Sequence, residues 1–157
     1  MTEEILRFLR EIGIAVRLEG IAEPTFLPGI SIDSGALKVD LARLKYPGDL
    51  LHEAGHLALM EPAQRAAARG DAGDDPGYEM GAIAWSYAAA VHLGMDPRVV
   101  FHEDGYRRGS RAILDALTSG ACIGTPMLHW LGLALDEPGA RARGLKPYPY
   151  MLRWLRE

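Results

Sequence analysis

The apolar residues at the start of the chain are spaced first like those of a helix and then like those of a strand. Residues 2–12 carry apolar side chains three and four positions apart and are followed by Gly13, which predicts an amphipathic helix that ends there. The next apolar residues alternate with charged ones, which predicts a short, half-buried strand through Ile14, Val16 and Leu18.

A loop and a β-hairpin are predicted next. Pro24 and Pro28 bound the loop, and the two runs that follow, residues 29–32 and 36–40, alternate apolar and other residues as strands do. The residues between these runs, 33–35, are Asp, Ser and Gly, which favour a tight turn. We therefore expect a small β-sheet ahead of the helical part of the chain.

Helical patterns dominate the middle of the chain. Residues 49–60 form an apolar, helix-favouring run after a Pro-Gly pair, and the alanine-rich residues 62–69 predict one or two further helical turns. Residues 70–77 hold a dense cluster of Gly, Asp and Pro, which predicts a loop. Residues 78–93 are apolar nearly all round, which is typical of a buried helix.

Two glycines lie inside these predicted helices. Gly55 and Gly81 each cost a helix about 1 kcal/mol relative to alanine, so a packing reason for them is expected. We expect the two helix backbones to approach each other closely at these positions.

The last third of the chain has weaker patterns. Asp96 is placed to begin a short helix, Ser110 can cap a helix over residues 111–117, and residues 120–135 are apolar but broken by Gly and Pro. The aromatic tail, residues 146–156, is expected to dock either on its own domain or on a second subunit of a homo-oligomer.

The composition is that of an ordinary globular domain. The chain has 157 residues, of which 48% are hydrophobic and 24% charged, and it contains no internal repeat, low-complexity tract or linker. Together with the patterns above, this predicts one α+β domain over residues 1–157, mainly helical with a small N-terminal sheet. The net charge of −4 and the pI near 5.7 argue against nucleic acid as a partner, because proteins that bind it usually carry a basic stripe.

We expect a cytoplasmic protein that has no membrane partner. The chain begins with acidic residues instead of the basic and apolar regions of a signal peptide, and its apolar runs, residues 80–95 and 121–135, are too short or too interrupted to cross a bilayer. The single cysteine, Cys122, cannot form an internal disulfide, which favours a reducing compartment. We expect its side chain to be a small, buried apolar group.

The strongest chemical signal is the spacing His-Glu-x-x-His formed by His52, Glu53 and His56. Residues four apart lie on one face of a helix, with Cβ atoms roughly 5–6 Å apart, so both imidazoles can reach one metal ion. Zinc binds neutral imidazole nitrogen, and catalytic zinc sites use three protein ligands and keep a fourth position for water. The carboxylate of Glu53 is then placed to take a proton from that water. The alternative is a half-exposed helix whose His and Glu side chains only face solvent.

Glu79 is the predicted third ligand. It is the only acidic residue between Asp75 and Asp96, and it lies near the start of a buried helix, where a carboxylate needs a partner or an ion. The alternative is that its charge only complements the helix dipole, by about 0.3–1 kcal/mol. The reserve candidates for the third ligand are His92, His102, Asp74 and Asp75.

The motif His52-Glu53-Ala54-Gly55-His56, followed by a helix bearing Glu79, resembles that of the zincin metallopeptidases of the gluzincin branch. The compact layout is similar to that of ImmA/IrrE-type peptidases, and the resemblance covers residues 29–93. It implies a zincin-like domain in which His52, His56 and Glu79 hold Zn²⁺ and Glu53 is the base that activates water. The helix around Glu79 lacks the Asn-Glu and Glu-Ala-Asn patterns common in those groups.

These features support two main hypotheses of function. The first is a small zinc hydrolase that cleaves peptide or protein substrates, with an extended peptide adding to an edge strand of the hairpin at residues 29–40. The second is a non-catalytic zincin-like module that binds a protein partner, with zinc structural or absent. A zinc hydrolase of non-peptide amides is a third hypothesis. The group that would stabilise the oxyanion in an enzyme is open among Tyr87, His102, Tyr106 and His129.

Overall fold

The computed structural model describes residues 1–70 and 75–157. Ahead of the histidine motif it contains one helix and three strands: α1 (Thr2–Glu11), β1 (Ala15–Leu18), β2 (Ile30–Asp33) and β3 (Ala36–Val39). These elements agree with the apolar patterns in this part of the sequence. The hairpin turn consists of Ser34 and Gly35, which both have positive φ, as a two-residue turn between twisted strands requires.

In the described part of the chain the strands form one sheet with the order β1-β3-β2-β4. β4 is a two-residue strand, Arg69–Gly70, although the alanine-rich pattern predicts helix up to Arg69. β3 pairs with β1 in parallel and with β2 in antiparallel orientation, and β4 pairs with Ile32 and Asp33 of β2. The prediction that a strand of the hairpin lies at an edge of the sheet is therefore wrong. β3 has β1 as its outer neighbour and β2 has β4, so the edge strands of the described sheet are β1 and β4.

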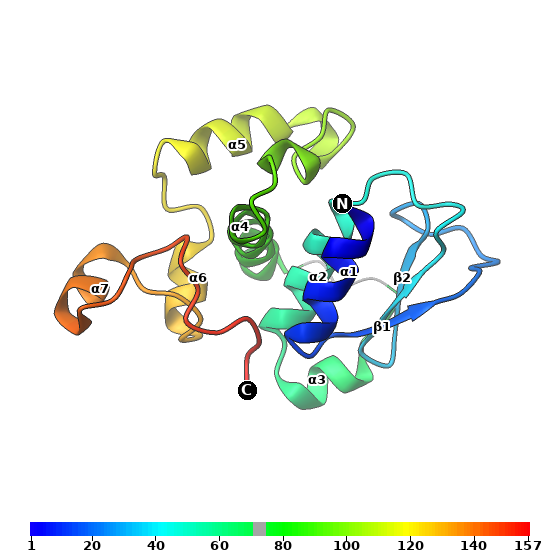
Figure 1. Cartoon of the computed structure of the whole chain (residues 1–157), viewed down its shortest axis with the longest axis horizontal. Helices are drawn as coiled ribbons and strands as arrows, with labels where there is room; N and C mark the ends of the chain where they lie inside the picture. The colour runs from blue at the N-terminus through cyan, green and yellow to red at the C-terminus, as the bar shows by residue number, and fades with distance from the viewer. Residues whose placement is uncertain (71–74) are drawn as a thin grey trace.

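The other elements are helical: α2 (Asp49–Leu59), α3 (Pro62–Ala67), α4 (Pro76–His92), the 3-10 turns η1 (Pro97–Val99) and η2 (Tyr106–Arg108), α5 (Ser110–Thr118), α6 (Thr125–Trp130) and α7 (Glu137–Arg143). In Figure 1, α4 runs through the middle of the molecule, with α1, α2 and the sheet on one side and α6 and α7 on the other. The structure confirms the predicted α+β class, mainly helical with a small sheet. No helix in the described residues is both long enough and apolar enough to cross a bilayer.

α2 and α4 approach each other closely at Gly55, as predicted. A Cβ atom on Gly55 would lie only 3.0 Å from the carbonyl oxygen of Ala82 on α4. Gly81 is confined in a different way, because the side chains of Leu59 and Met127 fill the space beside it, at 2.8 and 3.0 Å from where its Cβ would be. Of these two glycines, Gly55 is thus the one that lies where the two helix backbones approach each other closely.

Two predictions for the last third of the chain are wrong. α5 begins at Ser110 itself, and the Ser110 hydroxyl does not cap the helix but is buried without a hydrogen-bond partner among the described residues. Cys122 is exposed and not buried, and it lies in the connection between α5 and α6.

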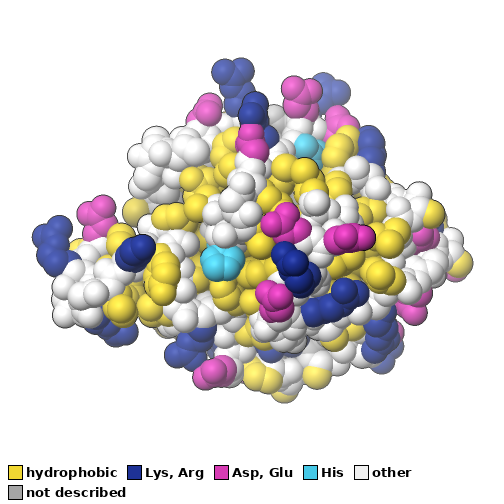
Figure 2. All heavy atoms as spheres, in the orientation of Figure 1, with side chains coloured by type: hydrophobic (Ala, Val, Ile, Leu, Met, Phe, Trp, Pro, Cys, Tyr) yellow, Lys and Arg dark blue, Asp and Glu magenta, His cyan; other side chains and the backbone are white. Residues whose placement is uncertain are grey.

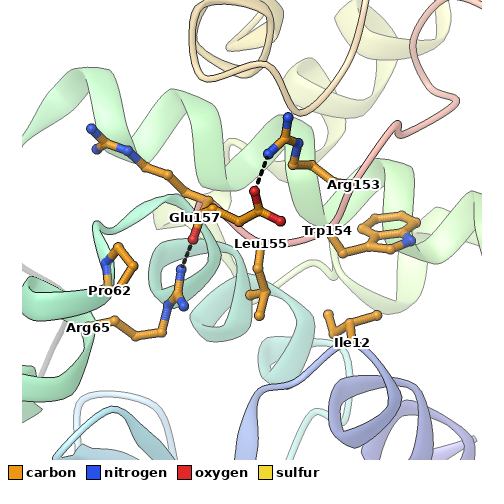
Figure 3. Close-up of a pocket in the computed structure, with 8 residues that line it drawn as sticks. Ile12, Pro62, Arg65, Arg153, Trp154, Leu155 and Glu157 are labelled. Carbon is orange, nitrogen blue, oxygen red and sulfur yellow. Dashed lines mark hydrogen bonds and ion pairs between the residues drawn. The ribbon is translucent and has the colours of Figure 1, made fainter.

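The C-terminal tail docks on its own domain, which is the first of the two predicted arrangements. The ring of Trp154 packs edge-on against Phe8 of α1 and Trp85 of α4, with ring centroids 5.0 and 5.3 Å apart. The indole nitrogen of Trp85 donates a hydrogen bond to the carbonyl oxygen of Trp154 at 2.9 Å. Figure 3 shows Arg65 reaching the tail, where its guanidinium donates to the carbonyl oxygen of Arg156 at 2.6 Å.

Candidate metal centre

The packing of α2 and α4 brings three of the predicted site residues together. Nε2 of His52 lies 3.2 Å from Nε2 of His56, one turn further along α2. Glu79, in the first turn of α4, places Oε2 at 3.0 Å from Nε2 of His56 and Oε1 at 3.7 Å from Nε2 of His52. Within the described ranges, this is the one group of three His, Cys, Asp or Glu residues whose ligand atoms all lie within 4.8 Å of one another.

The geometry and chemistry of this cluster fit a zinc ion. Two ligand atoms about 2.1 Å from zinc and at a tetrahedral angle are roughly 3.4 Å apart. The three separations of 3.0, 3.2 and 3.7 Å lie on either side of that value. Two imidazoles and one carboxylate are also a donor set of catalytic zinc, which leaves a fourth position for water.

The surroundings of the cluster keep His52 and Glu79 in the protonation states that bind a cation. Burial, reinforced by the neighbouring His56, lowers the pKa of His52 to about 4, against the opposing effect of Glu79. The hydrogen bond with His56 holds the pKa of Glu79 below its ordinary value, although burial acts the other way. At neutral pH, His52 is therefore uncharged with a free electron pair and Glu79 is ionised, as metal binding requires.

Glu53 lies beside the cluster without belonging to it. It is half-buried, it follows His52 directly on α2, and its charge contributes to raising the pKa of the Tyr106 phenol. The Glu53 carboxylate is therefore near enough to Tyr106 for its charge to act on the phenol. This position is compatible with the predicted role of a base next to the metal ligands.

Tyr106 extends the cluster on the far side of His52. Its hydroxyl oxygen lies 2.9 Å from Nδ1 of His52, and the two rings meet edge to face with centroids 5.3 Å apart. Burial raises the pKa of Tyr106, and the charges of Glu79, Asp49 and Glu53 act in the same direction, so the phenol stays protonated at neutral pH. The sequence marks Tyr106 only as a candidate for the oxyanion, and no local pattern indicates its contact with His52.

A second polar pair lies one turn before His52. Nε2 of His102 is 2.9 Å from Oδ1 of Asp49, the first residue of α2, and the His102 ring stacks on Tyr46 with centroids 3.7 Å apart. Burial raises the pKa of Asp49, and the hydrogen bond from His102 opposes that change. Sequence reasoning missed this pair, because an acidic residue at a helix start has an ordinary local explanation and its partner is 53 residues away.

The reserve candidates for the third ligand are engaged elsewhere or lie outside the described residues. His92 packs against Phe8, with ring centroids 5.6 Å apart, and His102 is bonded to Asp49. The Asp75 carboxylate caps α4 by accepting hydrogen bonds from the first backbone N–H groups of that helix. Asp74 and half of the predicted loop over residues 70–77 fall in residues 71–74, which are outside the described residues.

The four candidates for the oxyanion group are spread over the fold. Tyr106 is next to the cluster, and His102 lies one turn of α2 away from it, bonded to Asp49. Tyr87 packs against Phe101 and Tyr148, and His129 is exposed on α6. By position, Tyr106 is therefore the candidate nearest to the predicted metal ligands.

No family model, curated protein or solved structure matches this chain significantly. The argument for a function therefore rests on the residues of the chain itself and on the geometry that brings them together.

Proposed function

We propose that this protein is a small zinc-dependent hydrolase whose substrates are peptides or proteins. The observation that carries the proposal is the convergence of His52, His56 and Glu79, from two helices, at separations that suit one zinc ion. Two imidazoles and a carboxylate are costly to bury in a largely apolar helix pair unless something compensates for the loss of water. A bound metal ion would provide that compensation. The likeness of the motif to that of zincin metallopeptidases supports peptide bonds as the target.

In this proposal the residues of the site divide the chemistry among them. His52, His56 and Glu79 hold the ion, which when bound supplies a Lewis acid and lowers the pKa of water. Glu53 accepts a proton from the attacking water while the water oxygen bonds to the carbonyl carbon of the substrate. Glu53 then delivers that proton to the leaving nitrogen as the C–N bond breaks. The products are one carboxylic acid and one amine.

The second candidate function is a non-catalytic zincin-like module that binds a protein partner. A fourth protein ligand would favour this function, because it would close the zinc site to water. The described residues supply no such ligand, since the exposed His92 packs beside the rings of Phe8 and Trp154 and His102 is bonded to Asp49. The lack of a fourth protein ligand among the described residues supports a hydrolase. Non-peptide amides are the alternative substrate class for such a hydrolase.

The first test is the zinc content per chain, measured by elemental analysis after reconstitution with zinc. We expect about one zinc per chain in the wild type and a large loss in both His56→Ala and Glu79→Ala. His129→Ala is the matched control, because His129 is exposed on α6 and does not belong to the cluster. Loss in His56→Ala alone would remove Glu79 from the ligand set, and a wild type without zinc would overturn the proposal.

The second test is hydrolysis of a fluorescence-quenched casein and of a mixed peptide library, with mass spectrometry of the products. We expect the zinc-loaded wild type to cleave peptide bonds, and we expect the chelated wild type and His56→Ala to leave them intact. A zinc-loaded protein that cleaves neither substrate would contradict peptide hydrolysis and support the binding module.

A further inference from the structure

The two nitrogens of His52 face different neighbours. Nε2 points at the cluster, where Nε2 of His56 lies at 3.2 Å and Oε1 of Glu79 at 3.7 Å. Nδ1 points the other way and lies 2.9 Å from the Tyr106 hydroxyl. To bind zinc as proposed above, His52 must have a free electron pair on Nε2, so its ring hydrogen must be on Nδ1. The hydrogen-bond partner of Nδ1 therefore determines whether the electron pair of Nε2 is available.

The hydrogen bonds of the metal-free cluster determine which nitrogen of His52 carries hydrogen. An ionised carboxylate only accepts, so Nε2 of His56, which lies 3.0 Å from Oε2 of Glu79, carries a hydrogen. A ring nitrogen that carries hydrogen has no electron pair with which to accept, so in the contact of 3.2 Å between the two Nε2 atoms His52 must be the acceptor. An imidazole whose Nε2 accepts carries its hydrogen on Nδ1, and this N–H donates to the oxygen of Tyr106.

We propose that Tyr106 is a positioning residue for the metal centre, which holds His52 in the Nδ1–H tautomer by accepting the hydrogen bond from Nδ1. Histidines that bind metals usually donate their second ring N–H to an oxygen acceptor such as a carboxylate or a backbone carbonyl, and removing the acceptor weakens metal binding by about 10–100-fold. The inference rests on the zinc site of the proposed function and does not require hydrolysis.

The backbone around Tyr106 is held in an unusual conformation that delivers the phenol to His52. Tyr106, Arg107 and Arg108 have φ values of 49°, 53° and 69°, in the left-handed region that costs an L-residue about 1–2 kcal/mol. Such a conformation persists only where the surroundings hold it in place. Here the segment is attached to α2 at two points, through His102 to Asp49 and through Tyr106 to His52.

The experiment compares the zinc dissociation constants of the wild type, Tyr106→Phe and Tyr148→Phe, measured by competition with a chromogenic chelator. Tyr106→Phe removes only the hydroxyl, and we expect its dissociation constant to rise about 10–100-fold. Tyr148→Phe is the matched control, because it also removes a half-buried hydroxyl, one that donates to the carbonyl oxygen of Ala84 and does not touch the cluster. We expect the control to bind zinc like the wild type.

A second readout is the tautomer of His52 in the metal-free chain, observed by long-range ¹H–¹⁵N spectra of histidine-labelled protein. We expect the Nδ1–H form in the wild type and in Tyr148→Phe, and a mixture of tautomers in Tyr106→Phe. Unchanged affinity and tautomer in Tyr106→Phe would overturn the positioning role alone. A wild type that binds no zinc would overturn the proposed function and the positioning role with it, so the two failures are distinguishable.

Discussion

Three ionisable side chains of the candidate site, His52, Glu79 and Tyr106, are each kept in one protonation state by their immediate neighbours. Burial lowers the pKa of His52 to about 4 and raises that of Tyr106, while the hydrogen bond with His56 lowers that of Glu79. Burial thus acts in opposite directions on a base and on an acid, but it favours the neutral form in both cases. At neutral pH the ionised carboxylate of Glu79 thus lies beside the uncharged imidazole of His52, which is a suitable environment for a divalent cation.

Replacing Glu53 with Gln tests the role of this carboxylate at the residue scale. Gln keeps the size of the side chain but cannot accept the proton of the attacking water, so we expect the rate of peptide hydrolysis to fall by about 10²–10⁴-fold or more. The zinc content should stay at the wild-type level, because Glu53 is not part of the ligand cluster. Glu103→Gln, which changes an exposed carboxylate, is the control and should keep both properties.

Two outcomes would contradict this assignment. Full hydrolysis by Glu53→Gln would show that another group takes the proton. Loss of zinc from the same variant would make Glu53 a ligand.

At the scale of elements, the site depends on how closely α2 can approach α4. Gly55 is next to His56 on α2, and it faces Ala82, which lies one turn after Glu79 on α4. A side chain at Gly55 would meet backbone atoms of α4, which have less freedom to move than the end of a side chain. The contact that lets the two helices meet is therefore adjacent to the residues that they bring together.

Gly55→Val should separate the two helices. A valine here would overpack the contact with Ala82, and we expect it to lower the free energy of unfolding of the metal-free protein by about 1–3 kcal/mol, measured by urea denaturation. The separation of His56 from Glu79 should also weaken zinc binding. Gly20→Val is the control, because no atom of residues 1–70 or 75–157 lies within 4 Å of the Cβ position of Gly20. Equal stability of Gly55→Val and the wild type would mean that the approach of these helices is not tight.

At the scale of the whole molecule, the C-terminal tail packs against the helices that carry the site. Trp154 joins Phe8 and Trp85 in an aromatic cluster between α1 and α4, and the backbone N–H of Arg156 donates to the carbonyl oxygen of Ala58 near the end of α2. The tail thus contacts both helices of the site.

On the face shown in Figure 2, acidic and basic side chains are interspersed around apolar areas, without a continuous area of one charge.

Trp154→Ala should show how much the docked tail contributes to stability. We expect a loss of about 3 kcal/mol in the free energy of unfolding, the lower end of the range for removing a buried tryptophan, because Trp154 is only partly buried. Trp130→Ala is the control: Trp130 is 72% exposed, and its loss should change the stability by less than about 0.5 kcal/mol. Similar denaturation midpoints for both variants would contradict a stabilising role of the tail.

The sequence by itself was sufficient for features that depend on neighbouring residues. Apolar spacing and turn residues act over a few positions, so they predicted α1, the hairpin, α2 and α4. The relation of His52 to His56 also follows from the helix alone, because residues four apart share one face. Glu79 could be proposed as their partner because an acidic residue in a buried helix requires an explanation.

The tertiary structure decided the contacts between distant segments. The bond between Tyr106 and His52 joins residues 54 positions apart, and that between His102 and Asp49 spans 53. The pairing of β4 with β2 and the exposure of Cys122 likewise depend on where whole segments pack. Such contacts form when the apolar faces of several elements are buried together, and no local spacing encodes which polar side chains then meet.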